Sequence, residues 1–159
     1  MSKLAKIHLF IIIASVSALI FAYISQYFFD LKPCILCHYQ RIIYWSILAN
    51  SLFCYFKYQK VGYYLALLLI VGNIGVAGFH SGVEHKIFTL NTCSATGIDN
   101  TSDVRALAKQ LQSLNAVRCD RPQLVVLGLS MAEWNALYLI ALLSLSIVFP
   151  IYNKSYFLD

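Results

Sequence analysis

Long apolar runs dominate the chain, and short polar segments separate them. Four runs are long enough to cross a lipid bilayer as helices, at about 9–29, 35–56, 61–79 and 134–152. At the rise of an α-helix, about 20 residues cover the roughly 30 Å of a hydrocarbon core. The pattern therefore predicts an all-α membrane protein, a four-transmembrane-helix bundle that forms a single membrane domain over residues 1–159.

Short motifs mark where two of these helices begin. Pro33 precedes the second run and suits a helix entrance, because a first-turn residue needs no N–H donor. Ser130 and Glu133 have the spacing of a capping box before the fourth run. Within the third run, three glycines at spacing three predict a groove for close helix packing: Gly72, Gly75 and Gly78.

One long polar segment, at about 81–130, separates the third and fourth runs. We expect it to be an extracytoplasmic loop. Residues 104–114 place apolar side chains on one helical face, which indicates a short amphipathic helix that either lies on the membrane surface or folds against the loop. Residues 124–129 are apolar but too short to span, so they either dip into the membrane interface or pack under the loop.

The composition supports lipid as part of the solvent. Apolar residues make up 60% of the chain and charged residues only 12%, against roughly 25% charged residues in soluble proteins. The net charge is +5, but the basic residues are scattered between the apolar runs and form no patch. Nucleic-acid binding is therefore excluded as the reason for the charge, and the scattered lysines and arginines indicate topology instead.

Cysteine placement decides the orientation. Four spans put both termini on one side, and Cys34, Cys37, Cys93 and Cys119 on the other. The density of positive charge in the short segments favours cytoplasmic termini. Exposed cysteines form lasting disulfides only in an oxidising compartment, so we expect these four on the extracytoplasmic side. Cys54 lies deep in an apolar run and is interpreted as a packing residue.

The Cys34-Ile35-Leu36-Cys37 motif carries the candidate chemistry. A C-x-x-C serves thiol–disulfide exchange, or it makes half of a zinc site; the wide sequence separation of Cys93 and Cys119 supports zinc poorly. Arg41 follows Cys37 by four residues and so shares its helical side. We expect both thiols in the first turn of the second helix, where the helix dipole and Arg41 lower the pKa of each. A topology anchor is the alternative interpretation of Arg41.

These motifs resemble the bacterial disulfide bond formation protein B family over nearly the whole chain. The matching positions are, in chain order, the K-P-C-x-L-C motif at 32–37, Tyr39, Arg41, Glu84, His85, Cys93, Cys119, the Leu127-Gly128-Leu129 segment, Met131 and Trp134.

The resemblance implies an inner-membrane dithiol:quinone oxidoreductase that reoxidises a periplasmic thioredoxin-fold oxidase of the DsbA type. The electron acceptor would be ubiquinone or menaquinone. Cys93 would exchange with the partner's active cysteine, and Cys119 would be its partner in the loop and pair transiently with Cys34. Cys37 would be the thiolate that meets the quinone ring, and Arg41 would stabilise that thiolate and the reduced quinone oxygen.

Five other polar residues have less defined roles. For Glu84 and His85 the resemblance implies a place near the quinone, and an interfacial polar cluster is the alternative. His38 is expected on the Cys34 face of its helix, as a proton relay or as an interface histidine. Gln40 departs from the glutamate familiar in the family at that position, and His80 is interpreted as a boundary residue.

Two other functions are compatible with the sequence. A quinone-epoxide-reductase-like enzyme also uses cysteines in a helical bundle, but its C-x-x-C is expected in a later helix. A non-enzymatic tetraspan assembly protein, with structural disulfides or a four-cysteine zinc site, explains the exposed cysteines but gives Arg41 no reason to face them. We expect no bound metal.

Overall fold

The computed structural model describes residues 3–88, 119, 122 and 124–152. Cys93 and the amphipathic helix expected at 104–114 lie outside the described residues.

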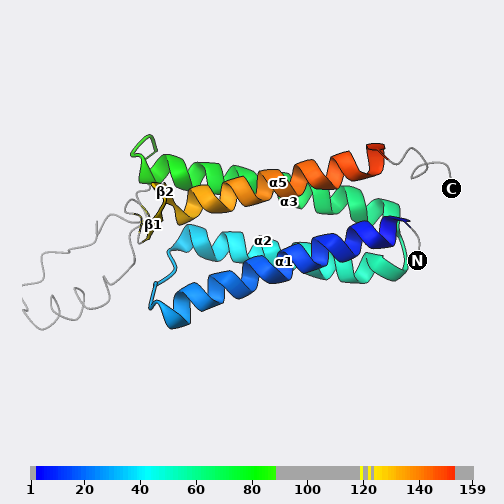
Figure 1. Ribbon diagram of the computed structural model, residues 1–159, viewed down its shortest axis with the longest axis horizontal. Coiled ribbons are helices and arrows are strands. Elements are labelled where there is room, and N and C mark those ends of the chain that lie inside the picture. The colour runs from blue at the N-terminus through cyan, green and yellow to red at the C-terminus, as the bar shows by residue number, and fades with distance from the viewer. Residues whose placement is uncertain (1–2, 89–118, 120–121, 123, 153–159) are drawn as a thin grey trace, which may run out of the picture.

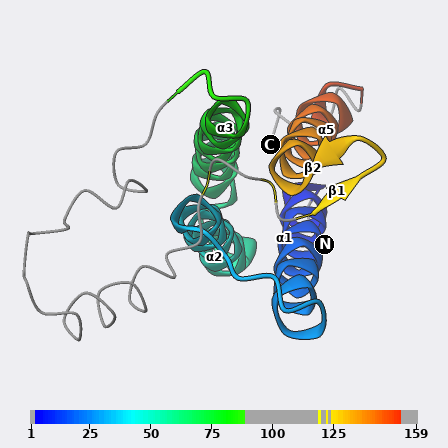
Figure 2. The ribbon, with the colours of Figure 1, turned by 90° about the vertical axis from the view of Figure 1, so that its left-hand side faces the viewer.

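Four long helices of the described chain pack lengthwise against one another (Figure 1). They are α1 (Lys3–Phe28), α2 (Ile35–Phe56), α3 (Gln59–Glu84) and α5 (Met131–Tyr152). Seen end-on in Figure 2, α2 packs between α1 and α3, and α3 also packs against α5. The start of α1 and the end of α5 lie at one end of the molecule, and the start of α2 lies at the other.

The core and the outer surface are both apolar. Every helix contributes a fully buried side chain to the core: Ile11, Ile47, Ile70 and Leu139. The outward faces carry large apolar side chains that remain exposed, among them Ile13 at 60%, Leu68 at 68% and Phe53 at 74%. Water would not stabilise such a surface, whereas lipid would.

Three helices in the described part of the chain are long and apolar enough to cross a membrane. These segments are Leu4–Phe28, Gln59–Glu84 and Met131–Phe149. The chain is therefore a membrane protein. Helix α2 has the ends that the sequence predicts but is not among the three, because polar residues in its first two turns, including Gln40 and Arg41, lower its hydropathy. Membrane crossing by α2 stays a prediction.

The predicted capping box at the start of α5 is confirmed. The Ser130 backbone N–H donates to Glu133 Oε2 at 2.7 Å, and the Glu133 backbone N–H donates to Ser130 Oγ at 3.2 Å. These two bonds satisfy N–H groups that have no partner within the helix. The helix consequently begins at a fixed point, which sets the position of its first two turns beside the other helices.

The short apolar segment before α5 forms a small hairpin. Strand β1 (Val125–Val126) pairs antiparallel with β2 (Leu129–Ser130). The two turn residues, Leu127 and Gly128, both have positive φ, at 54° and 82°. Positive φ at both positions is what a tight two-residue hairpin turn requires. The Trp134 indole N–H donates to the Val126 carbonyl at 3.0 Å and so fastens the hairpin to α5.

The predicted glycine groove on α3 is wrong. A Cβ atom at any of its three glycines would have no neighbour within 4 Å, because this face of α3 points away from the other helices: Gly72, Gly75 and Gly78. A close contact between α3 and α2 lies instead at the start of α3. A Cβ atom at Gly62 would overlap the Cys54 side chain there. Cys54 is buried there, as expected for a packing residue.

Candidate active site

The two cysteines of the C-x-x-C motif lie on either side of the start of α2. Cys34 is the N-cap residue, with extended φ and ψ of −75° and 171°, and its sulfur accepts the Cys37 backbone N–H at 3.4 Å. The Cys34 thiol donates to the Cys37 sulfur, and the two sulfurs are 3.2 Å apart. The expectation that both thiols lie in the first turn is therefore corrected: only Cys37 does, because the Cys34 side chain is used as the cap.

The environment of Cys34 keeps its thiol protonated. Its hydrogen bond to Cys37, followed by burial, raises the pKa of the Cys34 thiol to about 12, although the His80 contact lowers it. The expectation of a lowered pKa at both cysteines is therefore wrong for Cys34. A donor hydrogen bond from a thiol is lost when that thiol ionises, so the negative charge of the pair belongs on Cys37.

A third cysteine lies beside the pair. Cys119 is 1% exposed and packs in one cluster with Cys34, Leu36 and Val83, with Cys37 against its edge. The structure thus brings together three of the four cysteines that the sequence singles out. The fourth, Cys93, lies outside the described residues.

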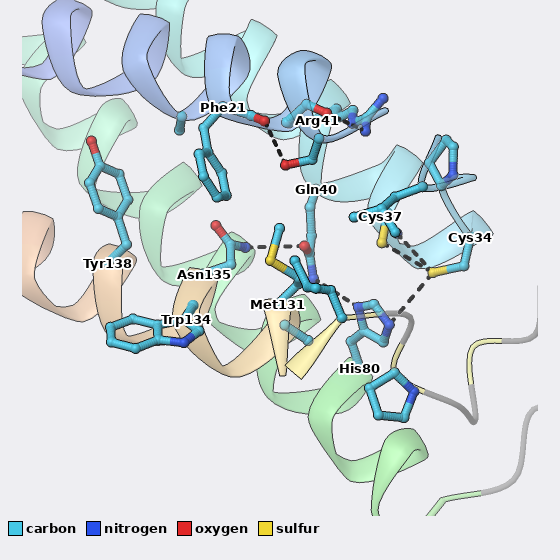
Figure 3. A pocket seen from close by; sticks show the side chains of 18 of the residues that line it. Phe21, Cys34, Cys37, Gln40, Arg41, His80, Met131, Trp134, Asn135 and Tyr138 are labelled. Carbon is cyan, nitrogen blue, oxygen red and sulfur yellow. Dashed lines mark hydrogen bonds between the residues drawn. The ribbon is translucent and has the colours of Figure 1, made fainter. Parts of the chain in front are cut away.

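A cavity of about 500 Å³ opens beside the two thiols (Figure 3). Cys34, Cys37 and Arg41 all line it. Most of its wall is apolar. Helices α1 and α5 each contribute five of the lining residues, with Phe21, Met131 and Trp134 among them. Cavities of this size and character hold a single flat organic molecule well.

Arg41 lines the cavity, but its guanidinium is anchored to α1. Nη1 donates to Gln26 Oε1, Nη2 donates to the Ala22 carbonyl at 3.0 Å, and the guanidinium carbon lies 5.1 Å from the centre of the Tyr23 ring. These hydrogen bonds of Arg41 go to helix α1 and not to a sulfur. Arg41 therefore supplies a positive charge at a fixed place on the wall of the cavity.

His80 of α3 contacts the thiol pair through Cys34. Its Nε2 lies 3.5 Å from the Cys34 sulfur and 3.6 Å from Glu84 Oε1, and its Nδ1 lies 3.4 Å from the side-chain nitrogen of Gln40. The imidazole is buried, at 4% exposed. The Glu84 side chain is 8% exposed and also lines the cavity. Its place near a quinone stays a prediction.

The polar contacts continue from His80 through α2 to α5. The Asn135 side-chain amide donates to Gln40 Oε1 at 3.1 Å, and the Tyr44 hydroxyl donates to Asn135 Oδ1 at 2.7 Å. Figure 3 shows Asn135, Gln40, His80 and Cys34 joined in this order.

Sequence reasoning missed most of this network. From the sequence, His80 is interpreted as a boundary residue and Gln40 only as a departure from a family pattern, and neither Asn135 nor Tyr44 stands out. Two signals were present. Polar residues inside an apolar run are costly in lipid and usually mark a site, and His80 and Glu84 have the i, i+4 spacing that places them on one helical face.

Two predicted polar residues lie away from the cavity. His85 is not among the described residues that line it; its imidazole is exposed and bonds Glu133 Oε1 at 2.8 Å. This contact ties the end of α3 to the start of α5. A place for His85 near a quinone stays a prediction. His38 is exposed on the outer side of α2, so the structure does not place it beside Cys34 as a relay.

The donors around the thiol pair resemble part of a metal site. Cys34, Cys37 and His80 offer two sulfurs and one nitrogen that lie within 4.8 Å of one another. Structural zinc sites are closed by four ligands, whereas this group, within the described residues, has three and borders a cavity. We therefore predict that elemental analysis of the purified protein finds well under one zinc atom per chain. One tightly bound zinc per chain would support the structural interpretation instead.

Fold and site together define a helical membrane protein with a dithiol at the edge of an apolar cavity. Comparison with protein families agrees: the family described as "Disulfide bond formation protein DsbB" matches residues 5–149. The chain belongs to this family, and it is accordingly a membrane disulfide oxidoreductase that acts in disulfide bond formation.

The chain is also similar to a curated protein of Rickettsia prowazekii (strain Madrid E), the uncharacterized protein RP370. The two are 32% identical over 155 residues, which is 93% of this chain and 90% of the relative.

Proposed function

We propose that the chain is a dithiol:quinone oxidoreductase of the bacterial inner membrane that reoxidises a periplasmic thioredoxin-fold oxidase of the DsbA type. The observation that carries the proposal is the shared boundary of the thiol pair and the cavity. Cys34 and Cys37 both line a largely apolar space of about 500 Å³, and the candidate membrane spans α1, α3 and α5 all contribute to its walls. A quinone is flat, apolar and dissolved in the bilayer, so it matches this space in chemistry and in location.

Electrons would pass through two cysteine pairs. The partner's dithiol would reduce a Cys93–Cys119 disulfide, which would in turn reduce a Cys34–Cys37 disulfide. The position of Cys119 against Cys34 supports the transfer between pairs, since the attacking sulfur must reach its target. The quinone, ubiquinone or menaquinone, takes up the two electrons together with two protons and leaves as quinol. Each cycle converts one dithiol into one disulfide.

The redox scale explains why a quinone is needed. Oxidases of the DsbA type have a known potential of roughly −120 mV, whereas ordinary C-x-x-C pairs lie at roughly −200 mV or below. A gap of about 80 mV is about 4 kcal/mol uphill for two electrons. An ordinary C-x-x-C pair therefore cannot oxidise such a partner unaided, and an acceptor with a higher potential has to remove the electrons.

Four membrane spans, with both termini cytoplasmic and the cysteines periplasmic, fit this function. Helix α2 would be the fourth span: its outer face is apolar, with Ile42 at 59% and Phe53 at 74% exposed, while its polar residues Gln40 and Arg41 turn toward other helices. The first residue of α1 and the last turn of α5 lie at the end of the molecule opposite the start of α2 (Figure 1). The segment between the end of α3 and the start of α5 would then be the periplasmic loop of a single membrane domain.

A steady-state assay tests the proposal. The purified chain is mixed with a reduced thioredoxin-fold oxidase and a soluble quinone analogue, and the quinone absorbance is followed. We expect catalytic loss of quinone that depends on both the chain and the reduced partner. The same assay with ubiquinone and menaquinone analogues shows which acceptor is preferred. Quinone that stays oxidised with every thiol donor would refute the function.

Replacing Arg41 by alanine is expected to raise the apparent quinone KM or to slow turnover by about tenfold. A fixed charge at the wall of an apolar cavity stabilises developing negative charge by roughly 1.5–3 kcal/mol through charged hydrogen bonds, and alanine removes it. Arg41→Lys retains the charge and should recover part of the loss. Normal kinetics for Arg41→Ala in correctly inserted protein would favour the anchor interpretation.

A further inference from the structure

The hydrogen bonds from Tyr44 to Cys37 all run in one direction. Tyr44 donates to Asn135 Oδ1, and the Asn135 amide N–H donates to Gln40 Oε1. The Gln40 nitrogen then meets His80 Nδ1. An amide nitrogen can only donate, so His80 Nδ1 must accept.

This arrangement fixes the tautomer of His80. With Nδ1 accepting, a neutral imidazole carries its proton on Nε2, which faces the Cys34 sulfur at 3.5 Å. The neighbouring Glu84 Oε1, 3.6 Å from the same nitrogen, favours a proton there as well. His80 therefore donates to Cys34, and Cys34 in turn donates to Cys37.

The chain of donors ends at a single acceptor, the Cys37 sulfur. Hydrogen bonds in series polarise one another, and burial strengthens the effect: Tyr44 and His80 are each 4% exposed and Gln40 is 7% exposed. A thiol that accepts a bond from His80 is a better donor to its neighbour. We propose that His80 is a positioning residue which, held in its Nε2–H form by Gln40, Asn135 and Tyr44, directs the Cys34 thiol toward Cys37 and so sustains the Cys37 thiolate. The inference deepens the proposed function, on which it rests.

Removing the donor at position 80 should lower the reactivity of Cys37. The full-length reduced protein is treated with iodoacetamide between pH 5 and pH 10, and mass spectrometry of peptides gives the alkylation rate of Cys37 alone. For His80→Leu we expect the rate at pH 7 to fall by about fivefold and the profile to move to higher pH. Among the described residues, the ionisable side chains near the imidazole are Cys34, Cys37 and Glu84, so Glu84→Gln is measured in parallel to separate its contribution.

Two amide variants separate a donated hydrogen bond from a titrating imidazole. The side-chain nitrogen of His80→Gln reaches the place of Nε2, whereas that of His80→Asn reaches only the place of Nδ1. We expect His80→Gln to keep the Cys37 rate within about twofold of the wild type and His80→Asn to behave like His80→Leu. If His80→Gln loses as much as His80→Leu, the proposal is overturned in favour of an acid–base role.

The Tyr44 end of this series of hydrogen bonds offers a matched pair of variants that leave His80 intact. Tyr44 and Tyr63 are both buried and both donate a hydroxyl hydrogen bond, but the Tyr63 bond goes to the Ser146 carbonyl, outside the chain of donors. Tyr44→Phe should slow Cys37 alkylation by about twofold, and Tyr63→Phe should leave it unchanged.

The outcomes distinguish this inference from the proposed function. Identical Cys37 profiles for wild type, His80→Leu and Tyr44→Phe, in variants whose helix content matches by circular dichroism, would overturn the role of the donor chain while leaving the oxidoreductase intact. A wild-type Cys37 that is alkylated no faster at pH 7 than the buried Cys54 would count against the thiolate itself, and so against the proposed function.

Discussion

Replacing Cys37 by serine is expected to lower quinone reduction by a factor on the order of 10³ or more, as removal of a nucleophile does in other enzymes. Cys37 is the acceptor of the Cys34 hydrogen bond and lines the cavity, so the charge of the reduced pair resides on its sulfur. A serine hydroxyl is not ionised near neutral pH and cannot form the disulfide. The measurement is the steady-state loss of quinone absorbance with a reduced thioredoxin-fold partner.

A second readout shows that the Cys37→Ser protein is otherwise intact. Because Cys93 is proposed to meet the partner, a mixed disulfide between the two proteins should still form and be visible on a non-reducing gel. Cys54→Ser is the matched control, since Cys54 is a buried thiol that packs against Gly62 at a distance from the cavity. Unchanged quinone turnover in Cys37→Ser would remove this residue from the reaction.

Replacing Cys119 by alanine is expected to separate the two halves of the reaction. Turnover driven by the thioredoxin-fold partner should fall by a factor on the order of 10² or more, because the loop disulfide is lost and the exchange beside Cys34 no longer has a positioned sulfur. Turnover driven by dithiothreitol, which reduces the Cys34–Cys37 pair directly, should stay within about threefold of the wild type. Both rates are measured with the same quinone analogue.

Equal losses with both reductants would contradict this division of labour. Cys119 is 1% exposed and packs on Leu36 and Val83, so such a result would mean that its contribution is to packing rather than to electron transfer. Cys119→Ser, which is nearly isosteric, tests the packing contribution separately. It should show the same selective loss as the alanine variant.

The strongest sequence predictions were those that a local rule controls. Hydropathy gave the helices, although three rather than four of them are apolar enough by composition alone. The Ser130–Glu133 capping box formed because it needs only four consecutive residues. A C-x-x-C before a helix likewise placed the two thiols together, and only their division between cap and first turn was not foreseen.

Predictions that depend on which face of a helix points toward its neighbours were less accurate. The glycines of α3 have regular spacing, but that face points away from the other helices, and spacing alone does not say which face is covered. Helical spacing predicts His38 and Cys34 on one face, yet His38 is exposed and Cys34 is buried. Cys34 precedes the helix with an extended backbone, so helical spacing does not set the direction of its side chain. His80 and Asn135 meet Gln40 only through tertiary packing of three helices, which no single segment encodes.

The most direct test is a single-turnover experiment that accounts for both electrons passed from the thiols to the quinone. The fully reduced chain is mixed without oxygen with one equivalent of quinone, and both the quinol formed and the position of the new disulfide are determined. The account predicts that quinol appears in proportion to a disulfide between Cys34 and Cys37. A quinone that stays oxidised beside the reduced pair, or a quinol formed with no disulfide at these two residues, would contradict it.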